Sequence, residues 1–121
     1  MAEAADIGLV LDCADPDALA AFWAPALGYT HVGTADAYAM LVPAEGRSGP
    51  KLLLQRVPER KQGKNRMHLD VETPDAEAKV AELEALGAKR VDDTTYEEMG
   101  HRWYVMADPE GNEFCVCTAG C

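Results

Sequence analysis

His68 is the side chain whose neighbours best suit it to chemistry. It lies in Asn65–Glu72, whose alternation is typical of a β-strand with Arg66, His68, Asp70 and Glu72 on one face. The apolar residues between them would pack against helices, so we expect His68 on the concave side of a sheet. An imidazole there would act as a general base, a metal ligand or a hydrogen-bond partner for substrate. The structural alternative is a histidine bonded only to a neighbouring side chain.

Cys115 and Gln55 are the next candidates. Cys115 alternates with Phe114 and Val116, which we predict to pack under the helices, so its thiol would face the same side as His68. A nucleophilic thiol would need a pKa depressed by a group such as His68, whereas the alternative is a small buried hydrophobic residue. Gln55 follows three leucines and would orient a ligand carbonyl or amide, which indicates a polar or wet pocket.

Aromatic side chains are candidates for the wall of such a pocket. Tyr38 and Trp103 are predicted to contact the ligand, and four residues are candidates for either core or pocket wall: Tyr38, Met40, Trp103 and Tyr104. Trp23 falls on an apolar helical stripe and is predicted to be core. His31 and His101 lie near turns and are expected to be exposed. Asp108 would order its turn, with Glu113 hydrogen-bonded inside it.

The elements that must position these residues occur twice in the chain. Residues 16–18 and 74–76 both read Pro-Asp-Ala, and residues 27–28 and 86–87 both read Leu-Gly. Two copies of one supersecondary unit, each too small to bury its apolar face alone, would share an interior surface. The pattern predicts one α+β domain over 1–121, with module one at 5–57, a basic linker or flap at 58–64, and module two at 65–118.

Each module is predicted to be β-α-β-β-β. In the first, Asp15 caps a helix that Pro16 opens and Gly28 ends, and strands cover 7–12, 29–33, 38–43 and 51–57. In the second, Thr73 caps a helix that Pro74 opens and Gly87 ends, and its apolar stripe is Val80, Leu83 and Leu86. Strands are predicted at 65–72, 89–96, 103–107 and 113–117.

Composition limits the function classes. The 121 residues carry a formal charge of −10, which argues against binding to nucleic acids and anionic membranes, because such binding needs a basic patch. The N-terminus lacks the apolar core of a signal peptide, and no apolar run reaches spanning length. We therefore expect a cytoplasmic protein whose four cysteines are thiols.

Four stretches resemble the vicinal oxygen chelate superfamily, which includes glyoxalase I, bleomycin-resistance proteins, fosfomycin-resistance enzymes and extradiol dioxygenases. They are Phe22–Tyr29, Leu52–Gln55, His68–Val71 and Asp108–Phe114, the last reading Asp-Pro-Glu-Gly-Asn-Glu-Phe. The resemblance implies two βαβββ modules that form a curled mixed sheet, or half-barrel, around a cleft. It also implies pairing of modules within one chain or across a homodimer.

The metal enzymes of that superfamily hold a divalent ion with the first and fourth strands of each copy. Carried over to this sequence, His68 keeps a ligand position, Gln55 stands where Glu is usual, and Cys115 stands where glyoxalase has Glu. The fourth corner falls on Gly8, or on Val10 in a shifted register, and neither binds metal. The resemblance therefore implies no full metal site and no resident cofactor. If a divalent metal is present, its ligands would be His68, Gln55 and Cys115.

Three functions remain open at this point. The preferred one is a bleomycin-resistance-like protein that binds a small organic molecule in the cleft between its modules through Gln55, His68 and Cys115. The second is a lyase, isomerase or epimerase in which His68 is the catalytic base and Gln55 polarises a carbonyl. The third is a structural or partner-binding module without a ligand.

Overall fold

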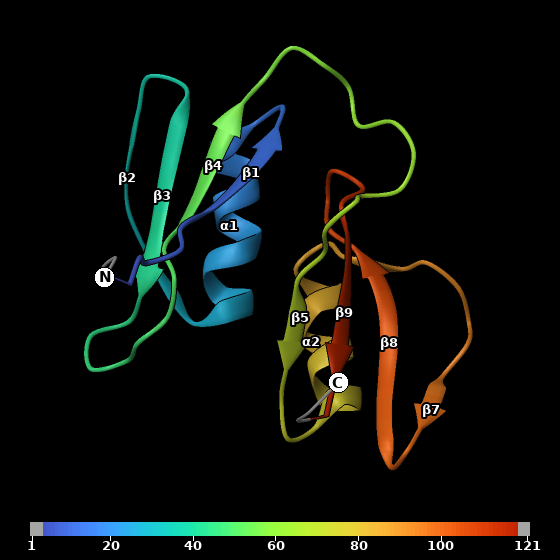
Figure 1. Cartoon of the computed structure of the whole chain (residues 1–121). Helices are drawn as coiled ribbons and strands as arrows, with labels where there is room; N and C mark the ends of the chain where they lie inside the picture. The colour runs from blue at the N-terminus through green and yellow to red at the C-terminus, as the bar shows by residue number, and fades with distance from the viewer. Residues whose placement is uncertain (1–3, 119–121) are drawn as a thin grey trace. The chain divides into compact units, whose positions relative to one another are not determined.

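The computed structural model describes residues 4–118 and divides the chain into two compact units. The division falls between Arg60 and Lys61, inside the segment predicted to join the modules. Each unit contains one helix and one mixed sheet, in the predicted order (Figure 1). The α+β class is therefore confirmed.

The first unit follows the sequence pattern closely. Its elements are β1 Leu9–Cys13, α1 Pro16–Leu27, β2 Tyr29–Ala35, β3 Tyr38–Pro43 and β4 Leu52–Arg56, with sheet order β1-β4-β3-β2. The Asp15 carboxylate accepts a hydrogen bond from the Ala18 N–H at 3.1 Å, and Gly28 ends α1 in the left-handed region at φ 68°. β1 pairs parallel with β4, which sets Asp12 opposite Gln55.

The second unit repeats this topology with a shorter helix and a shorter first strand. They are β5 Asp70–Glu72, α2 Ala76–Ala85, β6 Lys89–Arg90, β7 Tyr96–Glu98, β8 His101–Ala107 and β9 Glu113–Cys117. The sheet order is β5-β9-β8-β6, and β7 also pairs with β8. β5 is parallel to β9, with Asp70 opposite Cys115.

Two predictions for the second unit were wrong at element boundaries. Asp75, not Thr73, caps α2, because its carboxylate accepts from the Ala78 N–H while the Thr73 N–H stays bonded to the Cys117 carbonyl oxygen. The strand predicted over 89–96 is interrupted because the Asp92 carboxylate accepts bonds from the Thr94 N–H and the Tyr96 hydroxyl. Such side-chain bonds compete with a sheet ladder.

The strand predicted over 65–72 is also shorter than expected and begins at Asp70. Upstream of the Asp70–Cys115 pair, the same register would set Met67 opposite Asn112. Asn112 lies in the turn before β9 and is bonded to Asp108. His68 and Leu69 would lie opposite Glu113 and Phe114 of β9, but the chain bends at residues 66–67 and the ladder begins only at Asp70. His68 therefore lies just before the ladder, in an irregular segment.

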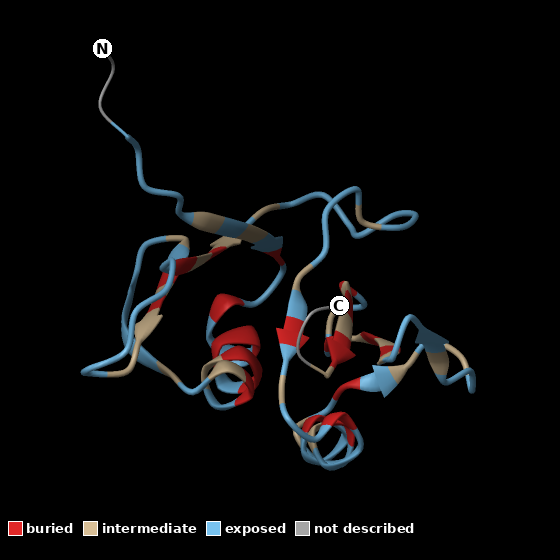
Figure 2. Cartoon of the chain, turned by 60° about the horizontal axis from the view of Figure 1, so that its bottom comes forward, coloured by how far each residue is buried: buried red, intermediate tan, exposed pale blue. Residues whose placement is uncertain are grey.

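The core of each unit lies between its helix and its sheet, as the buried residues in Figure 2 indicate. Trp23 is only 1% exposed, which confirms it as core, and Phe114 and Val116 are buried as predicted. Tyr104 also belongs to the core. Over residues 4–118, neither helix combines the length and apolarity that a bilayer crossing requires.

The cysteines differ from one another. Cys13 and Cys115 are thiols, as expected, whereas Cys117 is disulfide-bonded, so the expectation of a thiol was wrong there. Cys121 lies outside the described residues.

Candidate functional site

A pocket of about 430 Å³ opens on the second unit. Its lining comes from β5 and the segment before it, from β7 and the turn that follows it, and from β8 and β9. The lining residues are His68, Asp70, Glu98, Met99, His101, Trp103 and Cys115. Three predicted site residues, His68, Trp103 and Cys115, are thus brought together within one unit.

His68 and Asp70 form a pair at the pocket. The His68 Nε2 atom lies 3.3 Å from Asp70 Oδ1, and both side chains are about two-fifths exposed, at 42% and 40%. A carboxylate on one ring nitrogen orients the imidazole and leaves the other nitrogen for a second partner. The i, i+2 spacing on a predicted strand was the signal that these two side chains share a side.

Cys115 is half-buried beside this pair. Burial raises the pKa of the Cys115 thiol, and the neighbouring Asp70 carboxylate raises it further, against a smaller opposing effect of Lys64. The depressed pKa that a nucleophilic cysteine needs is therefore absent. The alternative, a small buried hydrophobic residue, fits only in part, because Cys115 is half-buried and lines the pocket.

Trp103 and the β7–β8 turn supply the apolar part of the lining. The Trp103 ring stacks on Tyr96, with centroids 5.6 Å apart and an interplanar angle of 10°. His101 opens β8, is half-buried and contacts the pocket, so the expectation that it is exposed was wrong. Its place was not predicted because the turn at Met99–Gly100, which pairs Glu98 with His101, brings His101 to the pocket.

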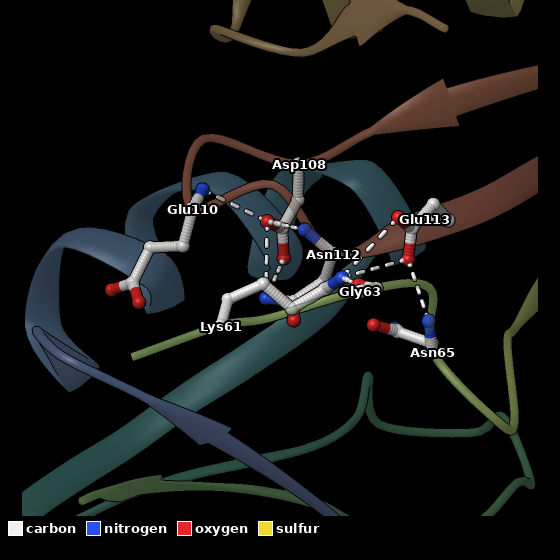
Figure 3. Close-up of polar contacts among 7 residues, drawn as sticks. All are labelled: Lys61, Gly63, Asn65, Asp108, Glu110, Asn112 and Glu113. Atoms are coloured by element: carbon white, nitrogen blue, oxygen red, sulfur yellow. Dashed lines mark hydrogen bonds and ion pairs between the residues drawn. The ribbon is translucent and has the colours of Figure 1, made fainter. Parts of the chain in front are cut away.

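Glu113 anchors the segment that carries His68 (Figure 3). Its carboxylate accepts a hydrogen bond from the Asn65 N–H at 2.9 Å and forms an ion pair with Lys61 Nζ at 3.2 Å. The hydrogen bond from the Asn65 N–H is the main reason why the pKa of Glu113 is lowered. Glu113 was predicted to bond within its own turn. Its carboxylate does contact its own backbone, but it also bonds to Lys61 and Asn65 outside that turn.

Asp108 orders the turn that precedes Glu113, as predicted. Its carboxylate accepts from the backbone N–H groups of Glu110 and Asn112 and from the Asn112 side-chain amide, at 2.9 to 3.1 Å. Asp108 and Asn112 are both buried. The Asp-Pro-Glu-Gly-Asn-Glu stretch therefore builds a rigid turn whose last carboxylate holds residues 61–65.

A family model described as "Glyoxalase-like domain" matches residues 8–117. The chain belongs to this glyoxalase-like family of the vicinal oxygen chelate superfamily. The match covers nearly the whole chain and therefore both units.

Solved structures support the same fold. A glyoxalase/bleomycin resistance protein/dioxygenase family enzyme from Burkholderia phytofirmans PsJN matches with a TM-score of 0.76 at 16% identity, over 91% of this chain and 94% of that one. The fosfomycin resistance protein FosX from Listeria monocytogenes matches with 0.77 at 11% identity, over 98% and 95%. The comparison with curated proteins found no match.

A third solved structure that matches this fold contains a metal ion. An E126Q mutant of the Listeria monocytogenes FosX protein, complexed with Mn(II) and 1S,2S-dihydroxypropylphosphonic acid, matches with a TM-score of 0.72 at 12% identity, over 90% of this chain and 85% of that one. This identity is low enough that the likeness concerns the fold alone.

The donor groups of this glyoxalase-like chain fit a divalent cation. One nitrogen of His68, one carboxylate oxygen of Asp70 and the Cys115 sulfur all lie within 4.8 Å of one another. Imidazole, carboxylate and thiolate are all established zinc ligands. Such an ion would supply Lewis-acid chemistry, polarising a ligand carbonyl or activating water. Asp70, which the predicted ligand set omitted, completes this group.

Gln55 and Tyr38 lie in the first unit of the glyoxalase-like chain. They are cross-strand neighbours, since the β3–β4 register sets Tyr38 opposite Gln55. Tyr38 is 41% exposed and Gln55 is half-buried. Their roles in ligand binding stay predictions.

Proposed function

We propose that this glyoxalase-like protein binds a small organic molecule in the pocket of its second module. The observation that carries the proposal is the combination of an apolar wall, from Trp103 and Met99, with the converging polar groups His68, Asp70 and Cys115. Ligand sites typically measure about 300–1,000 Å³ and pair apolar linings with a few polar groups. The pocket volume falls in this range.

The lining also suggests the ligand's chemistry. Trp103 offers an indole beside the pocket, which favours a flat or aromatic part of the ligand. Asp70 and Glu98 contribute carboxylates, which favour a ligand whose polar end donates hydrogen bonds or carries positive charge. Small aromatic amines therefore match the pocket better than aromatic carboxylates do.

Calorimetric titration tests this proposal. A panel of small aromatic amines and matched aromatic carboxylates is titrated into the full chain in EDTA. We expect saturable binding of amines, weakened at least tenfold by Trp103→Ala, and unchanged by Val91→Ala, which alters an exposed side chain outside the pocket lining. Absence of binding by every amine, or equal affinity in Trp103→Ala, would overturn the proposal.

Gln55 and Tyr38 enter the same test as the predicted contribution of the first module. We expect Gln55→Ala and Tyr38→Phe to weaken amine binding, each by less than Trp103→Ala does. A homodimer is proposed on the superfamily resemblance, and sedimentation equilibrium of the full chain would detect it.

A second candidate is a lyase, isomerase or epimerase, and the His68–Asp70 pair favours it. With Asp70 accepting from the Nε2–H group, Nδ1 keeps the lone pair that would take a proton from a carbon beside a carbonyl. The C–H bond breaks, its electrons pass to the carbonyl as an enolate, and return of the proton gives the isomer. His68 is the catalytic base in this scheme.

Deuterium exchange distinguishes this enzyme from a binding protein. A panel of α-hydroxy ketones and thioesters is incubated with the full chain in D₂O, and α-proton loss is followed by NMR. We expect exchange to disappear in His68→Gln and to slow by about 10- to 100-fold in Asp70→Asn. If no compound exchanges faster with enzyme than without it, the simple binding protein is the better description.

A further inference from the structure

We infer that His68, Asp70 and Cys115 form a zinc-type metal site contained entirely within the second module. The three residues line the pocket of the proposed function, so this inference rests on that pocket, but it assigns a metal ion as a further ligand. It also differs from the arrangement that the superfamily resemblance implied, in which Gln55 of the first module would share the ion.

The backbone brings the three donors together. Asp70 is paired in register with Cys115, and the Cys115 N–H donates to the Leu69 carbonyl oxygen at 2.9 Å. This bond joins Leu69 to β9. Because Leu69 lies between His68 and Asp70 in the sequence, both of these residues are held next to Cys115. Glu113 fixes the segment immediately upstream. No part of the first unit is needed for this arrangement.

The distances suit a single ion. All three donor atoms lie within 4.8 Å of one another. Zinc bonds of about 2.0–2.3 Å in a tetrahedral arrangement place two ligand atoms roughly 3.5 Å apart. Movements of about an ångström, within the reach of partly exposed side chains, would complete the site. Three protein ligands leave one position open, as in catalytic zinc sites.

The donor chemistry selects the type of metal. A thiolate and an imidazole prefer zinc or cobalt(II) to the harder ions Mn²⁺ and Mg²⁺, which prefer all-oxygen sites. A thiolate and a carboxylate together offset the charge of a divalent ion, which the neutral Gln55 amide does not. The thiol must lose its proton when the ion binds, as is general for cysteine ligands.

Cobalt(II) provides a direct test, because a cobalt–thiolate bond gives an ultraviolet charge-transfer band. The full chain is freed of metal with a chelator and titrated with Co²⁺ under nitrogen, without thiol reductant, so that Cys117 stays disulfide-bonded. We expect one Co²⁺ per chain, displaced by Zn²⁺ and not by Mg²⁺. The band should vanish in Cys115→Ser, and affinity should fall at least tenfold in His68→Ala and Asp70→Asn.

One control variant, Cys13→Ser, and one variant that distinguishes the two arrangements, Gln55→Ala, make the test specific. Cys13→Ser alters the buried thiol of the first unit and should leave both band and affinity unchanged. Gln55→Ala should change cobalt affinity by less than about twofold. Loss of affinity in Gln55→Ala comparable with that in His68→Ala would overturn the one-module site, as would a band that survives in Cys115→Ser or the absence of cobalt binding.

Folding and ligand binding are checked separately. Far-UV circular dichroism verifies each variant, and Cys115→Ala replaces Cys115→Ser if the serine variant fails to fold. Amine binding in EDTA reports the proposed function without metal. If cobalt binding fails while amine binding persists, the metal site alone is wrong, and the reverse result rejects the binding function but not the metal site.

Discussion

The two modules share a backbone register but carry different side chains at equivalent positions. In the first module Asp12 pairs with Gln55, and two residues upstream Val10 pairs with Leu53. In the second module Asp70 pairs with Cys115, and the repeat places His68 where Val10 stands. Among residues 4–118, the donor cluster His68–Asp70–Cys115 therefore has an inert counterpart in Val10–Asp12–Gln55.

The modules also differ in where the ladder ends. Val10 and Leu53 continue the parallel pairing of β1 and β4, whereas their counterparts His68 and Glu113 do not pair. The Glu113 side chain holds the segment before β5 through Asn65 instead. The first module has the longer parallel ladder. In the second module the first strand is shorter, and side-chain contacts hold the segment that carries the His68 imidazole. The candidate site of this chain thus lies where regular pairing stops.

Removing one large side chain of the first core tests whether the two modules are energetically separate. Phe22 is 1% exposed and packs edge-to-face on Trp23. We expect Phe22→Ala to lower the free energy of unfolding by about 3–5 kcal/mol because it leaves a cavity. Urea denaturation measures this, and cobalt affinity of the folded variant should stay within about twofold. A large loss of cobalt affinity would contradict a site confined to the second module.

Exchanging side chains between the modules tests the comparison most directly. The double substitution His68→Val and Cys115→Gln gives the second module the donors of the first, and we expect cobalt affinity to fall at least 100-fold, about 2.8 kcal/mol. The reciprocal Val10→His and Gln55→Cys gives the first module a His-Asp-Cys set, and a second Co²⁺ should bind. Absorbance titration gives the stoichiometry. If the reciprocal variant binds only one ion, register alone does not suffice and the irregular segment at His68 is also required.

Much of the fold was predictable from local sequence signals. Asp15, Pro16 and Gly28 define α1 because capping depends on neighbouring residues alone. The start of β5 was not predictable in this way, because it depends on parallel pairing with β9, which lies some 45 residues later along the chain. Asp75 displaced Thr73 as the cap of α2 for a similar reason, since the sheet retains the Thr73 N–H.

The candidate site was predicted in part. His68, Cys115 and Trp103 were placed on the concave side by strand alternation, and they line one pocket. Asp70 was seen on the same face as His68 but not counted as a ligand, because the superfamily pattern assigns that role to another strand. His101 was missed because its position depends on a turn whose residue Met99 adopts φ 53°, a conformation the side chain does not signal.

Loss of the Glu113 anchor should have a smaller effect on the site. Glu113→Ala removes the acceptor of the Asn65 N–H and the partner of Lys61, so the segment carrying His68 becomes looser. We expect cobalt affinity to fall about three- to tenfold, and less in Glu113→Gln, which keeps an acceptor. Hydrogen exchange of the Asn65 amide should accelerate in parallel. Glu84→Ala on the exposed side of α2 serves as the control, and equal effects of both alanine variants would argue against an anchor.

The smallest predicted effect concerns the Asp92 carboxylate, which is hydrogen-bonded to Tyr96. The Tyr96 hydroxyl donates to Asp92 at 2.8 Å, and this bond is the main cause that lowers the pKa of Asp92. Because the folded-state pKa lies below the unfolded value, the associated stabilisation is present above the unfolded pKa and is lost as pH falls through the folded pKa. Tyr96→Phe should raise the Asp92 pKa towards its ordinary value while keeping the ring stacked on Trp103. An NMR titration of the Asp92 carboxyl carbon measures this change.

Tyr38→Phe in the first module is the matched control, since it also deletes one phenol hydroxyl but should not move the Asp92 titration. Amine binding should be the same in Tyr96→Phe and the parent protein, because the pocket meets the ring of Trp103 and not the hydroxyl of Tyr96. If Tyr96→Phe weakens amine binding as strongly as Trp103→Ala, the Asp92–Tyr96 bond supports the pocket wall as well as the strand. The second module would then depend on side-chain contacts at both edges of its site, at Glu113 and at Asp92, where the first module relies on its ladder.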